Sequence, residues 1–222
     1  MKQAGTALAV GAGTGLLAGQ QAAAALPPAG KCKVLAFSGS RRVGKTTAAS
    51  LNLVLDSIRA TDANIETELF ELANYQLFGY GLKGADVPAD DFDLLAAKIR
   101  DPNVVGLVFG TPSYFGSISS LMKMFLEKFM AFRKDLELRN KIAGAIAVGG
   151  ARNGGQERCL EHIWTAISCQ QVIFAQDAHP TAHWGGTLWN QNDSIEGDEF
   201  GQNTAKNLGI RIAELVKLSA NR

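Results

Sequence analysis

The stretch that decides the fold is AFSGSRRVGKTTAASL, residues 36–51, which overlaps the end of the apolar run KVLAF at residues 33–37. Further along, apolar residues recur at i, i+3 and i+4 spacing, which predicts an amphipathic helix. The members of that apolar stripe are Leu51, Val54, Leu55 and Ile58. A buried strand, a loop rich in glycine and hydroxyl residues, and a helix in immediate succession are typical of an α/β protein.

The same strand-to-helix order recurs along the chain. Apolar, β-branched runs predict strands at residues 33–37, 65–70, 104–109, 142–148 and 171–175, and helical periodicity follows each of them. This alternation predicts a parallel sheet covered by helices on both faces. Ligands of such sheets bind beyond the carboxyl ends of the strands, so three loops become the candidate site. The remaining helical stripes, which we expect to form core, are Ile118, Leu121, Met122, Phe125 and Phe129, and then Leu208, Ile212, Leu215 and Val216.

The first loop carries groups that bind a phosphate. Its residues 39–46 fit G-x-x-x-x-G-K-[ST], the pattern of nucleoside-triphosphate P-loops. Hydroxyls and cations surround the start of the next helix, whose free N–H groups favour an anion. A P-loop enzyme also needs a magnesium carboxylate at the end of a nearby strand. The third strand ends in Gly-Thr-Pro and the fourth in Gly-Gly, so phosphate transfer stays a remote alternative.

The second loop lies in GTPSYFGSISSLMKMFLEKF, residues 110–129. Pro112 and Gly116 predict a turn, Tyr114 and Phe115 place aromatic surface beside free backbone N–H groups, and Ser117 is a suitable N-cap for the following helix. A flat, amphipathic ring system suits such a loop. The alternative is a helix-capping turn with a buried Tyr-Phe pair.

The third loop, VGGARNGGQE at residues 148–157, contains more glycine than one tight turn requires. We expect it to form a second wall of the same pocket, the alternative being a flexible connection. Further along, His183, Trp184 and Trp189 lie in a segment that either covers the ligand or forms an ordinary surface loop.

From these residues the chain resembles the flavodoxin-like NAD(P)H-dependent FMN reductases, and within them the iron-sulfur flavoprotein branch. SGSRRVGKTT parallels the phosphate loop of that family, and the segments DDFDLLAAKIRDPNVVGLVFGTPSYFGSISSLMKMFLEKF, GGARNGGQE and GQNTAKNLGIRIAEL match as well. The resemblance covers nearly all of residues 33–217. It implies a three-layer fold with a five-stranded parallel sheet in the order 2-1-3-4-5.

The resemblance also implies the residues that hold FMN. The phosphate would be held by Ser38, Ser40, Arg42, Thr46 and Thr47. The isoalloxazine would be lined by Pro112, Ser113, Tyr114, Phe115, Gly116 and Ser117, and its far edge would be closed by Gly150, Asn153 and Gly154. The P-loop match is then a lookalike produced by a flavin phosphate site.

One departure concerns iron. The iron-sulfur branch carries a compact cysteine cluster between the second strand and the segment matching residues 90–92, but here residues 72–92 contain no cysteine. A cluster needs thiolate ligands, so we expect FMN and no iron-sulfur cluster. The three cysteines of the chain have no metal-ligand spacing, and we expect Cys159 and Cys169 to be small core residues.

The resemblance implies electron transfer from NADH or NADPH through FMN to a small acceptor such as a quinone, a flavin, a nitroaromatic or a metal ion. No side chain is nominated as a catalytic acid or base, because the cofactor carries the chemistry. The alternative is an exported electron carrier for protein partners. The family also implies a homodimer or homotetramer. With 22 Lys and Arg against 21 Asp and Glu, the composition excludes an electrostatic case for nucleic acid or an anionic membrane.

The first thirty residues differ from the rest. Lys2, a weakly apolar stretch rich in Ala and Gly, and small residues around 22–25 are typical of an export signal, whereas the glycines and Gln20 disfavour a membrane anchor. The stretch resembles the part of a twin-arginine signal that follows the arginine pair. No such pair precedes the stretch in the sequence, so either the true start lies upstream of Met1 or the resemblance misleads. We therefore expect a signal-like segment at residues 1–30, one FMN-binding domain at 31–222 and a periplasmic or otherwise exported protein, the alternative being a cytoplasmic one.

Overall fold

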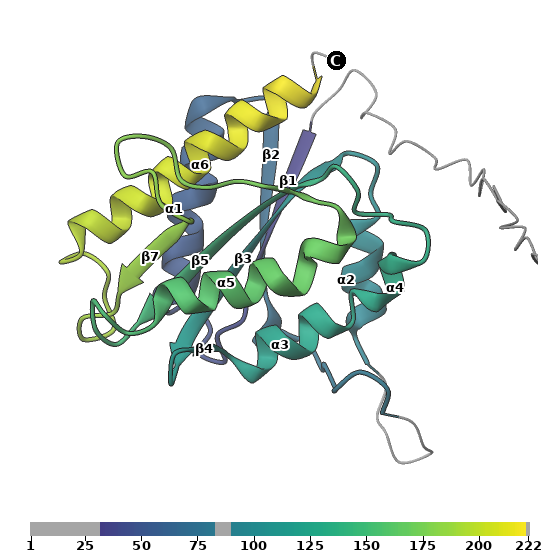
Figure 1. Cartoon of the computed structure of the whole chain (residues 1–222), viewed down its shortest axis with the longest axis horizontal. Coiled ribbons are helices and arrows are strands. Elements are labelled where there is room, and N and C mark those ends of the chain that lie inside the picture. The colour runs from purple at the N-terminus through teal and green to yellow at the C-terminus, as the bar shows by residue number, and fades with distance from the viewer. Residues whose placement is uncertain (1–31, 83–89, 221–222) are drawn as a thin grey trace, which may run out of the picture.

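The computed structural model describes residues 32–82 and 90–220 of the 222-residue chain. Its centre is a parallel sheet in the order β2-β1-β3-β5-β6, with β7 pairing with β5 as well. Figure 1 shows this sheet between two helical layers. The predicted α/β class, the parallel sheet and the flavodoxin-like strand order are confirmed. The principal strands are β1 (Cys32–Ser38), β2 (Ile65–Glu71), β3 (Val104–Tyr114) and β5 (Ile142–Gly149).

Each face of the sheet has its own apolar core. One face is covered by α1 (Thr46–Thr61) and α6 (Glu199–Ala220) and the other by α2 (Phe92–Ile99), α3 (Ser120–Glu127), α4 (Met130–Arg133) and α5 (Gln156–Ile167). The predicted apolar stripes are buried, except that Leu215 and Ile118 are only partly buried. Short 3-10 turns, η1 (Leu72–Asn74) and η2 (Ser168–Gln170), follow β2 and α5. No helix within residues 32–82 and 90–220 is both long and apolar enough to cross a membrane.

The fifth strand differs from the prediction. Only β6 (Ile173–Phe174) forms within residues 171–175, and the outer edge of β5 is completed by β7 (Gly186–Trp189). The chain leaves the sheet between them because the carboxylate of Asp177 accepts hydrogen bonds from the backbone N–H groups of His183 (2.7 Å) and Gly185 (3.2 Å). This excursion lets β7 run alongside the carboxyl-terminal half of β5.

Two local predictions are wrong. Ser117 does not cap the helix, because it lies in the short strand β4 (Ser117–Ile118), and the cap is Ser119, whose Oγ accepts from the N–H of Met122. Cys159 is buried in α5 as expected, but Cys169 is exposed. In η2 the neighbouring Gln170 takes the buried position and donates to the carbonyl of Phe129. The signal-like segment at residues 1–30 lies outside the described residues.

Candidate cofactor site

The phosphate loop joins β1 to α1. It turns at Gly44, where φ is +70° and the N–H donates to the carboxylate of Glu71 at 2.8 Å. The N-cap residue of α1, Lys45, makes no side-chain capping bond, so the first-turn amides stay available to an anion. Thr46 and Thr47 begin the helix and are buried beneath the loop. The arrangement is therefore a helix N-terminus that presents N–H groups to a negatively charged ligand.

Two serines of this loop lie in different surroundings. Ser40 accepts the N–H of Arg42 at 3.1 Å and thereby shapes the loop. Ser38 is fully buried at the end of β1, where its Oγ has no hydrogen-bond partner among the described residues.

The second loop is a tight hairpin between β3 and β4. Tyr114 pairs with Ser117, which leaves Phe115 (φ +52°) and Gly116 (φ +72°) as the two turn residues. Positive φ at both positions is the geometry of a type I′ turn. The side chain of Phe115 is fully exposed and points to solvent, whereas Tyr114 is about half exposed. Neither forms the buried aromatic pair of the alternative interpretation.

Hydrogen bonds connect this hairpin to the phosphate loop. The Oγ of Ser119 donates to the carbonyl of Gly39 at 2.6 Å, and the N–H of Ser119 donates to Thr111 Oγ1 at 3.0 Å. These two residues were not predicted as part of the site. Their hydroxyls hold the first and second loops at a fixed separation.

The third loop packs directly on the hairpin. Ser113 Oγ donates to the carbonyl of Gly154 at 2.5 Å. Gly155 has φ +84°, and a Cβ there would lie 2.6 Å from the Cα of Gly116. At Gly150, by contrast, a Cβ would meet nothing within 4 Å. The loop is thus packed on one side and open on the side of the cavity.

These loops enclose a cavity of about 250 Å³ at the carboxyl edge of the sheet. It brings together eight of the fourteen predicted site residues and three residues that were not predicted. The lining residues are Ser40, Arg42, Thr46, Thr47, Pro112, Ser113, Tyr114, Val148, Gly149, Gly150 and Asn190. Ser38, Phe115, Gly116, Ser117, Asn153 and Gly154 are not part of this lining, although they belong to the same three loops. Asn153 instead lines a neighbouring cavity with Arg158, His183 and Phe200.

A fourth segment, between β7 and α6, completes the site and was not predicted from the sequence. Asn190 lines the cavity, and Asp193 forms ion pairs with Arg42 (2.5 Å) and Lys45 (3.5 Å) of the phosphate loop. The Arg42 guanidinium, and then Lys45, lower the pKa of the Asp193 carboxyl. The letters WNQNDS, residues 189–194, could have indicated this segment, because Asn and Asp follow a short apolar run as they do in turns.

The residues fit a flavin mononucleotide. The uncapped start of α1 with Thr46 and Thr47 suits a phosphate, and the open backbone at Gly150 leaves room for a ring. The Oδ1 atom of Asn190 is buried without a hydrogen-bond partner among the described residues, as expected of a group that meets a ligand. Ser40, Arg42, Thr46 and Thr47 would hold the phosphate end, and residues 112–114 and 148–150 would flank the ring.

Sequence comparison identifies the class of protein. Residues 32–180 match the NADPH-dependent FMN reductase family, and the chain belongs to that family. It is 36% identical over 193 residues to iron-sulfur flavoprotein MJ1083 of Methanocaldococcus jannaschii, covering 84% of this chain and 98% of that one. The iron-sulfur flavoprotein of Methanosarcina thermophila is 27% identical over 193 residues, covering 84% and 96% of the two chains.

Solved structures show the same fold. RosB superposes with a TM-score of 0.65 at 18% identity, covering 84% of this chain and 79% of its own. The NADH:FMN oxidoreductase EmoB superposes with a TM-score of 0.53 at 18% identity, covering 86% and 89%. At these identities the likeness supports the flavodoxin-like architecture alone.

Proposed function

We propose that this FMN-dependent oxidoreductase passes electrons from NADH or NADPH to a small acceptor such as a quinone, a flavin, a nitroaromatic or a metal ion. The observation that carries the proposal is the cavity at the carboxyl edge of the sheet, in which the phosphate loop, the hairpin and the glycine-rich loop converge. FMN bound there would supply a ring that accepts hydride and returns the electrons to an acceptor. The family supports the cofactor, and its description supports NADPH as a donor.

The side chains of the site bind and orient, and none is required to move a proton. Thr46 and Thr47 place hydroxyls at the start of α1, and Arg42 adds positive charge at the mouth of the cavity. Gly150 leaves open space where a side chain would obstruct a ring. Tyr114, about half exposed, would leave one side of the site accessible to donor and acceptor.

A variant at the phosphate loop tests the cofactor assignment. Thr46→Val keeps the volume of a buried side chain and removes its hydroxyl, so we expect several-fold weaker FMN binding by fluorescence titration. Thr165→Val, on the exposed face of α5, is the matched control and should bind FMN like the unchanged protein. The purified protein should be yellow, and a colourless protein that ignores added FMN would refute the proposal.

The reaction is tested by steady-state assays with each nicotinamide and a quinone. Turnover with NADH or NADPH supports the reductase. A flavin-loaded protein that turns over with neither donor is instead an electron carrier for protein partners. The fully exposed Phe115 beside the cavity favours that second candidate, because an exposed aromatic at a site rim is suited to a protein contact.

Three further properties follow from the resemblance and are proposed with it. We expect FMN without an iron-sulfur cluster, because residues 72–92 hold no cysteine; iron and acid-labile sulfide analysis tests this. We expect a homodimer or homotetramer, tested by light scattering after size-exclusion chromatography. We expect export of the folded, flavin-loaded protein, tested by cell fractionation.

A further inference from the structure

One polar side chain of the cavity, that of Asn190, comes from outside the three predicted loops. Asn190 follows β7 and lines the cavity together with Thr46 and Thr47. Its Oδ1 atom is buried and accepts no hydrogen bond from a described residue. An unpaired buried acceptor costs free energy, so a ligand that donates to it gains affinity.

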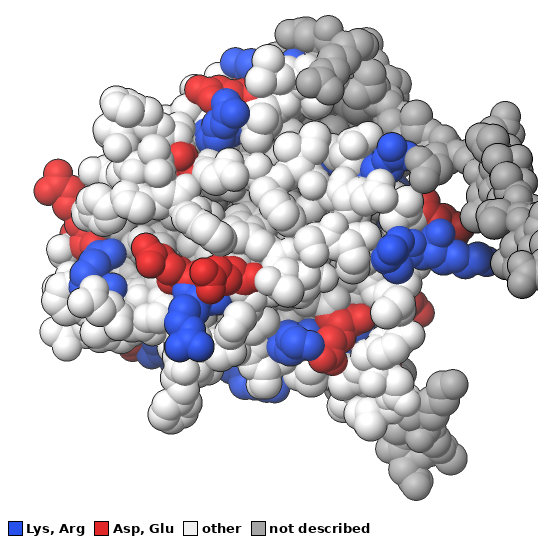
Figure 2. Space-filling view, viewed as in Figure 1, with Lys and Arg blue, Asp and Glu red and all other residues white. Residues whose placement is uncertain are grey.

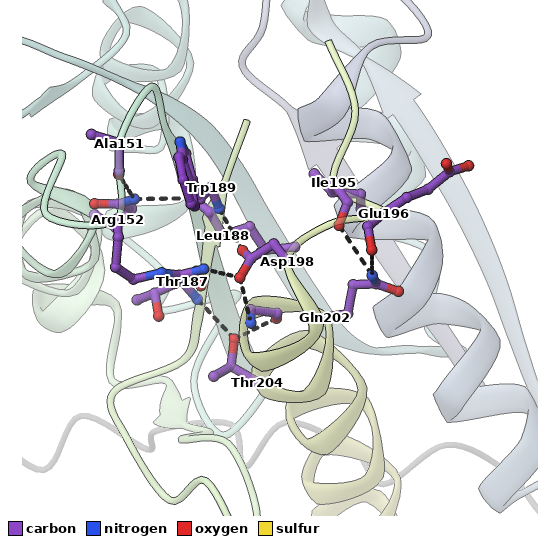
Figure 3. Close-up of polar contacts among 12 residues, drawn as sticks. Ala151, Arg152, Thr187, Leu188, Trp189, Ile195, Glu196, Asp198, Gln202 and Thr204 are labelled. Carbon is purple, nitrogen blue, oxygen red and sulfur yellow. Dashed lines mark hydrogen bonds and ion pairs between the residues drawn. The ribbon is translucent and has the colours of Figure 1, made fainter. Parts of the chain in front are cut away.

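The backbone around Asn190 is fixed on the side of the sheet. Its N–H donates to the carbonyl of Gly149 at 2.8 Å, and the indole N–H of Trp189 donates to the carbonyl of Gly150 at 3.2 Å. The N–H of Trp189 also donates to the buried carboxylate of Asp198 at 2.6 Å. Figure 3 shows Asp198 between Trp189 and Arg152, which connects β7, α6 and the glycine-rich loop.

The segment is also fixed on the side of the phosphate loop. Gln191 and Ser194 form an isolated antiparallel bridge, and the two residues between them have positive φ, which gives a tight turn. The tip residue of that turn, Asp193, pairs with Arg42 at 2.5 Å. Asn190 is therefore held between two anchored points, with its amide at the cavity.

The chemistry of FMN limits what can meet this oxygen. A phosphate dianion has no hydrogen to donate, so the donor must be a ribityl hydroxyl or the ring N3–H. Asn190 lies on the side of the sheet that carries the phosphate loop, since its own segment pairs with that loop through Asp193. We propose that Asn190 Oδ1 accepts a hydrogen bond from a ribityl hydroxyl of FMN and so sets how the cofactor is seated. This inference rests on the cofactor of the proposed function.

Flavin titrations of the cofactor-free protein test it. Asn190→Leu removes the acceptor at similar volume, and Asn190→Ala does so with a smaller side chain that cannot clash with the loop. We expect each to weaken both FMN and riboflavin by about tenfold, since both ligands carry the ribityl chain. Asn52→Leu, the same substitution at an exposed position of α1 outside the cavity lining, is the matched control and should leave both affinities unchanged.

Two further measurements separate the possible contacts. The N3–H resonance of bound ¹⁵N-labelled FMN should keep its position in both Asn190 variants, because a ribityl contact leaves that group unchanged. Thermal unfolding without flavin should match the unchanged protein, which distinguishes a lost contact from a damaged fold.

Four outcomes overturn the inference. They are unchanged FMN affinity in both Asn190 variants, a loss confined to FMN, a displaced N3–H resonance, and unfolding of both variants without flavin. If the unchanged protein binds no flavin at all, the proposed function itself fails, and that result is distinct from each of these.

Discussion

Asp198→Ala should destabilise the protein because it removes a buried carboxylate that accepts hydrogen bonds from three donors. Asp198 is 4% exposed and accepts from the N–H of Trp189, the N–H of Gly201 and the guanidinium of Arg152. Its bond to Gly201 caps α6, and loss of such a cap costs about 1 kcal/mol. The N–H of Trp189, left without its partner, costs about 1–2 kcal/mol more.

The ion pair contributes less than a fully buried one. The side chain of Arg152 is 36% exposed, so water can hydrogen-bond to its guanidinium when the carboxylate is removed. We therefore expect loss of the ion pair to cost about 1 kcal/mol. Because the three contacts share one side chain, their separate costs are not additive and their sum is an upper limit. We expect the free energy of unfolding to fall by about 3 kcal/mol. For a domain of this size, that lowers the melting temperature by about 6–12 °C.

Urea denaturation followed by circular dichroism measures this directly. Asp198→Asn keeps one acceptor oxygen without the charge and should lose about half as much stability. Glu214→Gln, in an exposed pair with Arg211 on the same helix, is the control and should change stability by less than about 0.5 kcal/mol. A loss below about 1 kcal/mol for Asp198→Ala would refute the view that this carboxylate holds the fourth segment in place.

Three other substitutions have expected outcomes. Phe115→Asn should stabilise the hairpin by about 0.5–1 kcal/mol in thermal melts, because Asn tolerates positive φ far better than an aromatic residue, and a lower melting temperature would contradict the turn geometry. Gly155→Ala should cost about 2–4 kcal/mol and weaken FMN binding, because its Cβ would meet the backbone of Gly116; stability equal to that of the unchanged protein would contradict this contact. Asp90→Asn should cost about 1 kcal/mol at pH 7. Burial alone would raise the pKa of Asp90, but Lys128 and two backbone N–H groups outweigh it and lower that pKa. The stabilisation is therefore complete at pH values above the pKa of an unfolded Asp, about 3.9, and is lost as the pH falls through the lowered value. The two unfolding curves should converge below that lowered value, and a gap that persists at the most acidic pH would contradict it.

The strands in the middle of the sheet could be predicted because their burial leaves a recognisable pattern in the sequence. A strand buried on both faces reads as an unbroken apolar run, and β1, β3 and β5 do so. The split outer strand has no such record. β7 is four residues long. The excursion before it depends on the hydrogen bonds that the Asp177 carboxylate accepts and on the close approach of Gly185 to a carbonyl of β5, which are tertiary contacts.

Site residues could be predicted where they follow a strand that the sequence indicates, and they were missed where they do not. The three predicted loops follow strands that the sequence indicates, and Thr46, Pro112 and Gly150 line the cavity that they form. Asn190 follows β7, so it was missed together with that strand. Ser119 was missed because the hairpin uses Ser117 for pairing and moves the helix cap two residues onward.

The distribution of charge supports an anion-binding role for the phosphate loop. On the face formed by α5 and α3, Lys and Arg side chains lie among Asp and Glu in small mixed groups (Figure 2). The phosphate loop concentrates cations differently, with Arg42 and Lys45 both reaching Asp193. Residues 41–45 carry three cations, whereas the carboxylates that contact this stretch are Asp193 and Glu71, so net positive charge is left over for a phosphate.

Glycine in the third loop serves two separate purposes. A Cβ at Gly149, Gly154 or Gly155 would lie 2.5 Å from Gln156 Nε2, 2.9 Å from the carbonyl of Ala151 and 2.6 Å from Gly116 Cα, respectively, so these three residues permit close packing. Only Gly150 borders open space. Three glycines therefore permit close packing of this wall, and one keeps it open. Of the three residues expected to close the far edge of the ring, Gly150, Asn153 and Gly154, only Gly150 lines this cavity.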